Sequence, residues 1–170
     1  MKQAIYAGSF DPFSIGHLEI LRRSLEIFDR VHVVVAVNRG KKPMFSESIR
    51  VDLIKQSISH LSEKIRERIV VDWEEGYIYQ YAEREDIKYF VRGIRNGLDL
   101  DYEVNIQEFN WNVSGIDTVY FTPIEHGRVS SSLIREYIKA GLPHMAVTLM
   151  SPAFNTPDGK KVLEKCIEGP

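Results

Sequence analysis

The chain has 170 residues and a formal net charge of −2, from 22 basic and 24 acidic side chains. This length suits one domain with its own core, and the balanced charge excludes a basic tail or stripe for nucleic acid. A single cysteine, Cys166, excludes an intrachain disulfide, and the apolar runs fall short of the ~20 residues of a membrane span. We therefore expect one soluble, cytoplasmic domain over 1–170 without nucleic-acid or membrane partners.

Short apolar runs alternate with longer amphipathic segments along the chain. They predict strand 3–7, helix 16–28, strand 31–37, helix 47–62, strand 69–72, helix 77–85, strand 88–92, helix 98–113, strand 118–122 and helix 131–140. The segment from about 143 to 170 is expected to be a C-terminal appendage with a short helix. Alternating strands and helices favour an α/β fold with a doubly wound, five-stranded parallel sheet.

Four of these helices carry a start or stop signal in the sequence. The signals are Ser14 and Ser46 before the first two helices, Asp99 and Asp101 in the first turn of the fourth, and Gly141 with Pro143 after the fifth. In a doubly wound sheet, ligands bind at the carboxyl ends of the strands, where the strand order reverses. The residues that follow each strand are therefore the candidates for chemistry.

The string GSFDPFSIGH, residues 8–17, follows the first strand. Gly8 permits a tight bend, and Gly16 lets a ligand approach the first helical turn, whose unpaired N–H groups attract phosphate. His17 can donate to a phosphoryl oxygen. The helix dipole disfavours its protonation and a bound phosphate favours it, so its charge stays open. Alternatively, the string is an ordinary glycine-rich turn with a capping serine.

Cationic residues follow the second and fourth strands. Arg39, Lys41 and Lys42 surround one glycine, and this loop either belongs to a solvated surface or adds cations to the sheet edge. Arg92 and Arg95 flank Gly93 just before a helix, and their planar guanidiniums match phosphate oxygens. The alternative for the arginines is ion pairing with nearby acids such as Asp99 or Glu103.

Three consecutive serines, 130–132, open the helix after the fifth strand and exceed what one helix cap requires. The sequence has no Walker-type loop, no dinucleotide fingerprint, no zinc motif and no serine nucleophile elbow. A phosphate monoester is already ionised at neutral pH and attacks without a general base. Several cations and donors around one cleft therefore favour transfer between two phosphorylated reactants.

The strings GSFDPFSIGH, KKPMF, RGIRNGLDLDYE and VSSSLIRE, in this order, closely resemble the phosphopantetheine adenylyltransferases of the HxGH nucleotidyltransferase superfamily. The resemblance covers residues 1 to about 140. It implies a Rossmann-like nucleotidyltransferase fold and transfer of AMP from ATP to 4'-phosphopantetheine, which gives dephospho-coenzyme A and pyrophosphate. It also implies Mg²⁺ with the nucleotide, coenzyme A as a feedback ligand, and a homo-oligomer, commonly a hexamer.

The resemblance also implies roles for single residues. His17 would stabilise the transition state at the α-phosphate, Lys41 would reach the acceptor phosphate, and Arg92 would lie on the pantetheine side. Ser9 would touch both ligands, with the backbone of Phe10 beside it. The further nucleotide-binding positions would be Gly93, Ile94, Arg95, Glu103, His126, Gly127, Arg128, Val129, Ser130, Ser131 and Ser132. No residues are predicted to form a protein-only metal cage.

The pantetheine arm would pass Ile78, in a stretch, GYIYQYAER, that is bulkier than is usual in the family. A sister enzyme acting on another acceptor, such as nicotinamide mononucleotide, is the alternative enzyme, but KKPMF and Ser14 disfavour it. Relatives with that acceptor usually carry histidine at the position of Ser14, whereas pantetheine enzymes usually carry threonine. A non-catalytic nucleotide or coenzyme A binding module is the alternative outside catalysis, and the joint presence of His17, Lys41 and Arg92 disfavours it.

Overall fold

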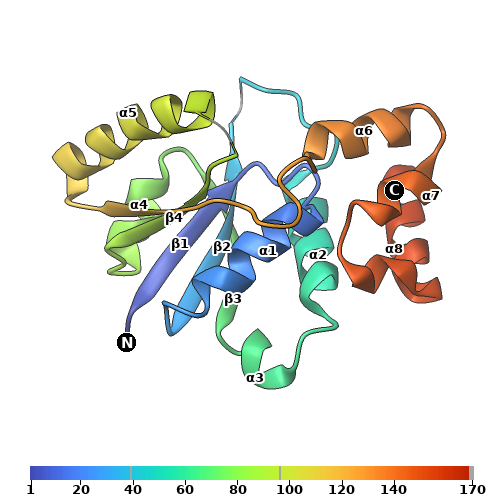
Figure 1. Cartoon of the computed structure of the whole chain (residues 1–170), viewed down its shortest axis with the longest axis horizontal. Helices are drawn as coiled ribbons and strands as arrows, with labels where there is room; N and C mark the ends of the chain where they lie inside the picture. The colour runs from blue at the N-terminus through green and yellow to red at the C-terminus, as the bar shows by residue number, and fades with distance from the viewer. Residues whose placement is uncertain (39, 96, 169–170) are drawn as a thin grey trace.

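The computed structural model describes residues 1–38, 40–95 and 97–168, with only the backbone at 98, 99 and 102. Arg39 and the side chain of Asp99, both named above, lie outside the described part. The predicted strands and helices are all found, in the predicted order (Figure 1). They are β1 Gln3–Gly8, α1 Ile15–Ser24, β2 Arg30–Val37, α2 Glu47–Ile58, β3 Ile69–Glu75, α4 Ile78–Arg84, β4 Tyr89–Gly93, α5 Gly97–Ser114, β5 Asp117–Phe121 and α6 Ser131–Lys139.

The five strands form one all-parallel sheet in the order β3-β2-β1-β4-β5, as the alternating pattern predicts. From β1 the chain first builds outward through β2 to β3, then returns to the other side of β1 for β4 and β5. The order therefore reverses between β1 and β4. The loops that leave these two strands diverge there and leave room for a ligand.

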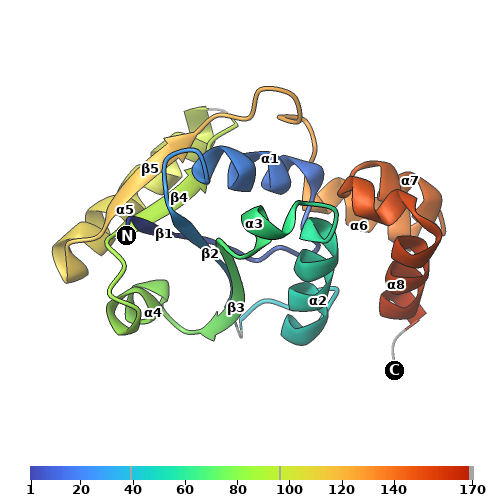
Figure 2. The ribbon, with the colours of Figure 1, turned by 90° about the horizontal axis from the view of Figure 1, so that it is seen from below.

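Helices cover both faces of the sheet (Figure 2). Alternate residues of β1 enter different clusters: Ala4 and Tyr6 pack with α1 and α2, whereas Ile5 and Ala7 pack with α4 and with Ile116, which lies between α5 and β5. Since successive side chains of a strand point to opposite faces, a strand that is apolar throughout is buried on both sides.

Helix α1 begins where the sequence predicts and ends earlier. Ser14 caps its first turn, but the helix ends at Ser24 rather than at residue 28. The guanidinium of Arg68 explains the early end, because it donates to the carbonyls of Leu25 and Phe28, the latter at 2.8 Å. Those carbonyls are held by a side chain from beyond α2, so the helical repeat does not continue.

The predicted helix 47–62 begins at the predicted residue and ends early. Helix α2 ends at Ile58, and a single turn, α3 (Glu63–Arg66), follows after Ser62 adopts the extended backbone of an N-cap. Ser46 caps α2 through the backbone N–H of Ile49, as predicted.

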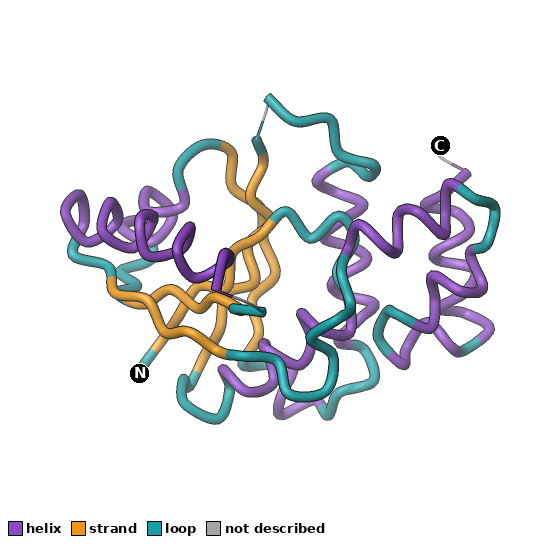
Figure 3. Tube along the Cα trace, turned by 45° about the horizontal axis from the view of Figure 1, so that its top comes forward, coloured by secondary structure: helices purple, strands orange, loops and turns teal. Residues whose placement is uncertain are grey.

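The C-terminal segment, 143–168, forms α7 (Pro143–Thr148), the 3-10 turn η1 (Pro152–Asn155) and α8 (Pro157–Glu168), which stand beside the sheet (Figure 3). Their apolar side chains form a separate buried cluster with α2 and α6: Phe45, Leu53, Ile134, Ala146, Val147, Met150, Phe154 and Leu163. Gly159 permits a close approach, because a Cβ there would lie 2.1 Å from the carbonyl oxygen of Ala153. No helix among the described residues is long and apolar enough to cross a membrane.

Candidate active site

A hollow of about 350 Å³ opens at the carboxyl ends of β1 and β4, where the strand order reverses. The starts of α1 and α6 and the loop after β5 complete its wall. Twelve of the predicted ligand-binding positions line it: Ser9, Phe10, His17, Arg92, Gly93, Arg95, Glu103, His126, Val129, Ser130, Ser131 and Ser132. Ser14, predicted as a helix cap, lines it as well. Residues that follow three of the strands, β1, β4 and β5, are thus brought together in one hollow, whereas the predicted segment after β2 does not line it.

His17 is held in one tautomer by the start of its own helix. Its Nδ1 accepts from the backbone N–H of Ser14 at 3.0 Å, while the Ser14 hydroxyl accepts from the His17 backbone N–H at 3.3 Å. A neutral ring therefore carries its proton on Nε2. Burial, with a further contribution from Arg95, lowers the pKa of His17 to about 4. The ring is neutral at pH 7 and offers one N–H donor.

The loop before His17 has an unusual backbone. Phe10 adopts φ 45°, a left-handed conformation that costs a non-glycine residue about 1–3 kcal/mol. Its buried ring packs edge-on against Tyr6, Phe13 and His17, each with a centroid separation of 5.2 Å. This packing offsets the backbone strain and fixes the wall of the hollow beside the imidazole.

Arg92 and Glu103 are paired with each other. The Nε of Arg92 lies 3.1 Å from Oε2 of Glu103, and its Nη1 donates to the carbonyl of Ala7. Ion pairing of this kind was the alternative that the sequence left open. The structure combines the ion pair with the predicted cationic site, because Arg92 and Glu103 both line the hollow and the guanidinium lies on its wall.

The three serines at the start of α6 have different hydrogen-bond partners. Ser130 caps the helix through the backbone N–H of Leu133. Ser131 donates to the carbonyl of Pro12 at 2.8 Å, and Ser132 accepts from Nη2 of Arg135 at 3.0 Å. Only Ser130 thus acts as the cap, Ser131 joins α6 to the loop after β1, and Ser132 binds Arg135 of its own helix.

The loop after β5 lines a second, adjoining hollow of about 500 Å³. The remaining predicted nucleotide positions, Ile94, Gly127 and Arg128, lie here, and Arg95 lines both hollows. The carboxylate of Glu19 on α1 anchors this loop. It accepts from the backbone N–H groups of Ile124 at 2.5 Å, Glu125 at 3.3 Å and His126 at 3.0 Å.

We expect Glu19→Gln to loosen this loop in a pH-dependent way. Burial alone raises the pKa of Glu19, but the backbone donors outweigh it, and the pKa lies below its usual value. A depressed pKa in the folded state adds stability above the usual glutamate pKa, and this stability is lost as the pH falls through the lowered value. Thermal unfolding should show the variant melting below wild type at pH 7, with the two curves converging in acid. A difference that stays constant down to the acid limit would contradict this assignment.

Lys41 and Ile78 lie outside both hollows. Lys41 is exposed on the loop after β2, and Ile78 begins α4, half-buried against the cluster on the far face of the sheet. The Lys41 loop is nevertheless connected to the site. The buried carboxylate of Asp11 accepts from the backbone N–H groups of Met44 at 2.8 Å and Phe45 at 2.9 Å.

Sequence reasoning missed four residues that hold the site together. Asp11 is one, and Glu19 is another. Arg135 donates to the carbonyl of Asp11 at 2.6 Å, and the buried Arg50 donates to the carbonyl of Ser9 at 2.8 Å. Asp11 lies inside the string GSFDPFSIGH, so its position was a signal that went unused. The partners of the other three lie dozens of residues away and leave no local pattern.

Comparisons with known proteins agree with this geometry. The Cytidylyltransferase-like family model matches residues 5–137. The chain is 38% identical to a phosphopantetheine adenylyltransferase of Nautilia profundicola, over 81% of this chain and 87% of the relative. It is 34% identical to one of Bifidobacterium animalis subsp. lactis, over 98% and 99%. The chain belongs to the phosphopantetheine adenylyltransferase family.

The fold of this family member also resembles that of a more distant enzyme. A bifunctional NMN adenylyltransferase/ADP ribose pyrophosphatase from Francisella tularensis superposes with a TM-score of 0.60 at 13% identity, over 96% of this chain and 52% of that one. At this identity the likeness concerns the fold alone. It agrees with the Rossmann-like nucleotidyltransferase architecture that the sequence predicted.

Acidic groups are scarce in the adenylyltransferase hollow. Glu103 is the only carboxylate on its described lining, and it is paired with Arg92. Among the described residues, no three His, Cys, Asp or Glu side chains lie close enough together to hold a metal ion. The described residues therefore do not fit a metal site built from protein ligands.

Proposed function

We propose that the protein transfers AMP from ATP to 4'-phosphopantetheine, forming dephospho-coenzyme A and pyrophosphate. The observation that carries the proposal is the hollow itself. It combines a neutral histidine donor with arginines and a serine-rich helix start at the strand-order reversal of a nucleotidyltransferase fold. The family's curated members bear this activity in their name.

The reaction needs no general base. An oxygen of the acceptor phosphate, ionised at neutral pH, attacks the α-phosphorus of ATP while the bond to the β-phosphate breaks, and pyrophosphate leaves with the bonding electrons. Negative charge concentrates on the α-phosphoryl oxygens as the two anions meet. His17 donates its Nε2–H to one of these oxygens. Because the ring is fixed by Ser14 and Phe10, this donor requires little reorganisation.

The cations divide between the two reactants. We assign Lys41 and Arg92 to the acceptor phosphate and Arg95, with Ser130–Ser132, to the triphosphate. Ser9 and the backbone of Phe10 face both. The nucleoside part is assigned to the adjoining hollow and its rim, with Gly93, Ile94, Glu103 and His126–Val129.

The acceptor arm is assigned to Ile78 at the start of α4. An aromatic group lies next to it: Tyr77 and Phe109 are 6.3 Å apart between ring centroids, and Tyr79 lies 5.6 Å from Tyr77. Tyr77 and Phe109 are exposed and offer an apolar surface for the uncharged arm. Coenzyme A shares this arm with the acceptor, so the same surface suits it as a feedback ligand.

We propose that Mg²⁺ enters with ATP and is held by phosphate oxygens and water rather than by the protein. This follows from the scarcity of carboxylates on the described lining. Such a mode of binding is usual for Mg²⁺, which keeps several waters and binds substrate phosphates.

We also propose a homo-oligomer, with the hexamer of the family as the specific expectation. Helix α5 supports it, because apolar side chains on several of its faces are exposed: Leu100, Val104, Phe109, Trp111 and Val113. Exposed apolar side chains that gather on one element mark a surface for protein association. Light scattering on the purified chain measures the assembly.

Pyrophosphate release tests the proposed function. Purified protein with ATP and Mg²⁺ is supplied with 4'-phosphopantetheine, with nicotinamide mononucleotide or with no acceptor. Release that depends strictly on 4'-phosphopantetheine supports the proposal. Release with nicotinamide mononucleotide would instead identify a sister enzyme, and ATP binding without release under any condition would identify a binding module.

A further inference from the structure

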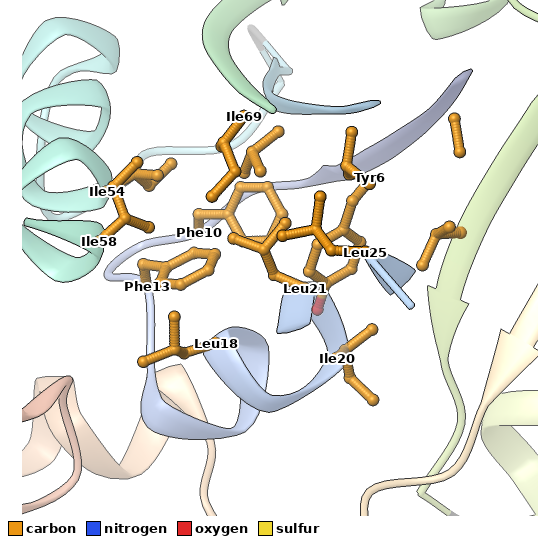
Figure 4. Close-up of a cluster of buried hydrophobic side chains, with 14 of the residues drawn as sticks. Tyr6, Phe10, Phe13, Leu18, Ile20, Leu21, Leu25, Ile54, Ile58 and Ile69 are labelled. Carbon is orange, nitrogen blue, oxygen red and sulfur yellow. The ribbon is translucent and has the colours of Figure 1, made fainter. Parts of the chain in front are cut away.

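Tyr6 lies in the middle of β1, within the apolar strand that the sequence predicts to be part of the core. Its side chain is only 4% exposed and packs with Phe10, and the tilted ring of His17 lies 6.4 Å away between centroids. In Figure 4 the single oxygen among the labelled side chains belongs to Tyr6. The residue nevertheless lines the 350 Å³ hollow.

The hydroxyl of Tyr6 makes no hydrogen bond to any described residue. Among the described residues, however, every fully buried side-chain oxygen has a hydrogen-bond partner. The phenol oxygen must therefore reach the hollow, where it is accessible. A buried tyrosine usually has a partner for its O–H. Here the partner has to come from outside the described chain.

The charged side chains that act on this hydroxyl are cationic, and the one carboxylate on the described lining, that of Glu103, is paired with Arg92. Arg92 and Arg95 are close enough to act electrostatically on Tyr6, and a guanidinium has no acceptor. His17 uses Nδ1 to accept from Ser14 and keeps a hydrogen on Nε2. Burial raises the pKa of Tyr6 above its usual value, despite both arginines, so the phenol keeps its proton. The arginines, the Nε2–H of His17 and the Tyr6 hydroxyl are therefore donors that suit an anion in this hollow.

We propose that the Tyr6 hydroxyl donates a hydrogen bond to a phosphoryl oxygen of the ATP bound in this hollow. The proposal rests on the proposed function, because it requires a nucleotide phosphate at the site. An anionic oxygen fits best, since it accepts several hydrogen bonds at once and gains from the neighbouring guanidiniums. A sugar hydroxyl or a base edge gains little from two cations.

Tyr6→Phe tests the proposal, because it removes one oxygen and keeps the ring packing. Calorimetry measures the binding of ATP and of adenosine to wild type, to Tyr6→Phe and to Tyr89→Phe. Tyr89 is a matched control: it lies on β4 outside the hollow, with its ring against Phe28 and Lys2. We expect Tyr6→Phe to weaken ATP ~10- to 100-fold, as for hydrogen bonds to charged groups, and to leave adenosine unchanged. Tyr89→Phe should match wild type for both ligands.

The outcomes separate this inference from the proposed function. Equal ATP affinities for Tyr6→Phe and wild type, with both proteins active, would overturn the role of Tyr6 and leave the proposed function standing. Parallel losses of ATP and adenosine would also overturn it, because the hydroxyl would then contact the nucleoside. If wild type binds no ATP, both proposals fail. Melting temperatures verify folding, and the variant loses no hydrogen bond between this hydroxyl and a described residue.

Discussion

Replacement of His17 by alanine is expected to lower kcat by about 10²- to 10³-fold with little change in the KM for ATP. Its Nε2–H hydrogen bond strengthens as negative charge builds at the α-phosphate, so its loss raises the barrier more than it weakens substrate binding. Initial rates of pyrophosphate release at saturating ATP and acceptor measure the effect. An unchanged kcat would remove His17 from the mechanism.

Two further variants separate the catalytic donor from the helix cap. His17 also accepts from the Ser14 backbone through Nδ1, so alanine removes both interactions. In His17→Asn, the side-chain oxygen can replace Nδ1 as the acceptor, but no donor replaces Nε2–H. In His17→Gln, the amide extends to the Nε2 position and offers an N–H. We expect asparagine to restore the melting temperature without activity, and glutamine to retain more of kcat.

The pH dependence follows from the same geometry. With a pKa of about 4, His17 is already neutral throughout the range from pH 6 to pH 9, so its donor does not titrate there. The ring gains a proton only as the pH falls through about 4. The ratio of kcat/KM for ATP between wild type and His17→Ala reports the free enzyme and should therefore be flat between pH 6 and pH 9. A ratio that changes with a midpoint near 6.5 would show that His17 titrates as an ordinary histidine.

The sequence predicts the strands well because two effects agree locally. Apolar runs such as 31–37 and the regular alternation with amphipathic segments both indicate a parallel sheet, and the sheet then dictates where ligand groups gather. This is why His17, Arg92 and the serine segment were found together. Helix ends are predicted less well. Helix α1 ends early because Arg68 binds the carbonyls of Leu25 and Phe28 just beyond it, and no pattern near residue 24 indicates that contact.

Contacts between residues far apart in the sequence also limit prediction of the site, because they leave no local pattern. The Glu19 carboxylate holds backbone groups more than one hundred residues away, and hydrophobic periodicity carries no information about such a pair. Lys41 illustrates a different limit. Its place on the loop after β2 is predictable, but a long exposed side chain has many rotamers. Its proposed contact with the acceptor phosphate is a property of the bound state.

Asp11 anchors the end of the Lys41 loop through two hydrogen bonds. Asp11→Asn should therefore weaken binding of the acceptor, 4'-phosphopantetheine. The two carboxylate oxygens accept from Met44 and Phe45, whereas an asparagine amide has only one oxygen. Its NH₂ group then faces one of these backbone donors and leaves it unsatisfied, which costs about 1–3 kcal/mol. We expect lower stability in urea and a KM for 4'-phosphopantetheine raised ~10- to 100-fold, with the KM for ATP less affected.

Combination with Lys41→Ala shows whether Asp11 acts through the lysine. If the carboxylate positions Lys41, the Asp11→Asn change should add little to the acceptor KM once Lys41 is gone, because two residues that act as a unit give non-additive effects. Asp52→Asn on the exposed side of α2 makes the same change of charge away from the loop and should behave as wild type. Full additivity of Asp11→Asn and Lys41→Ala would mean that Asp11 supports the fold without positioning the lysine.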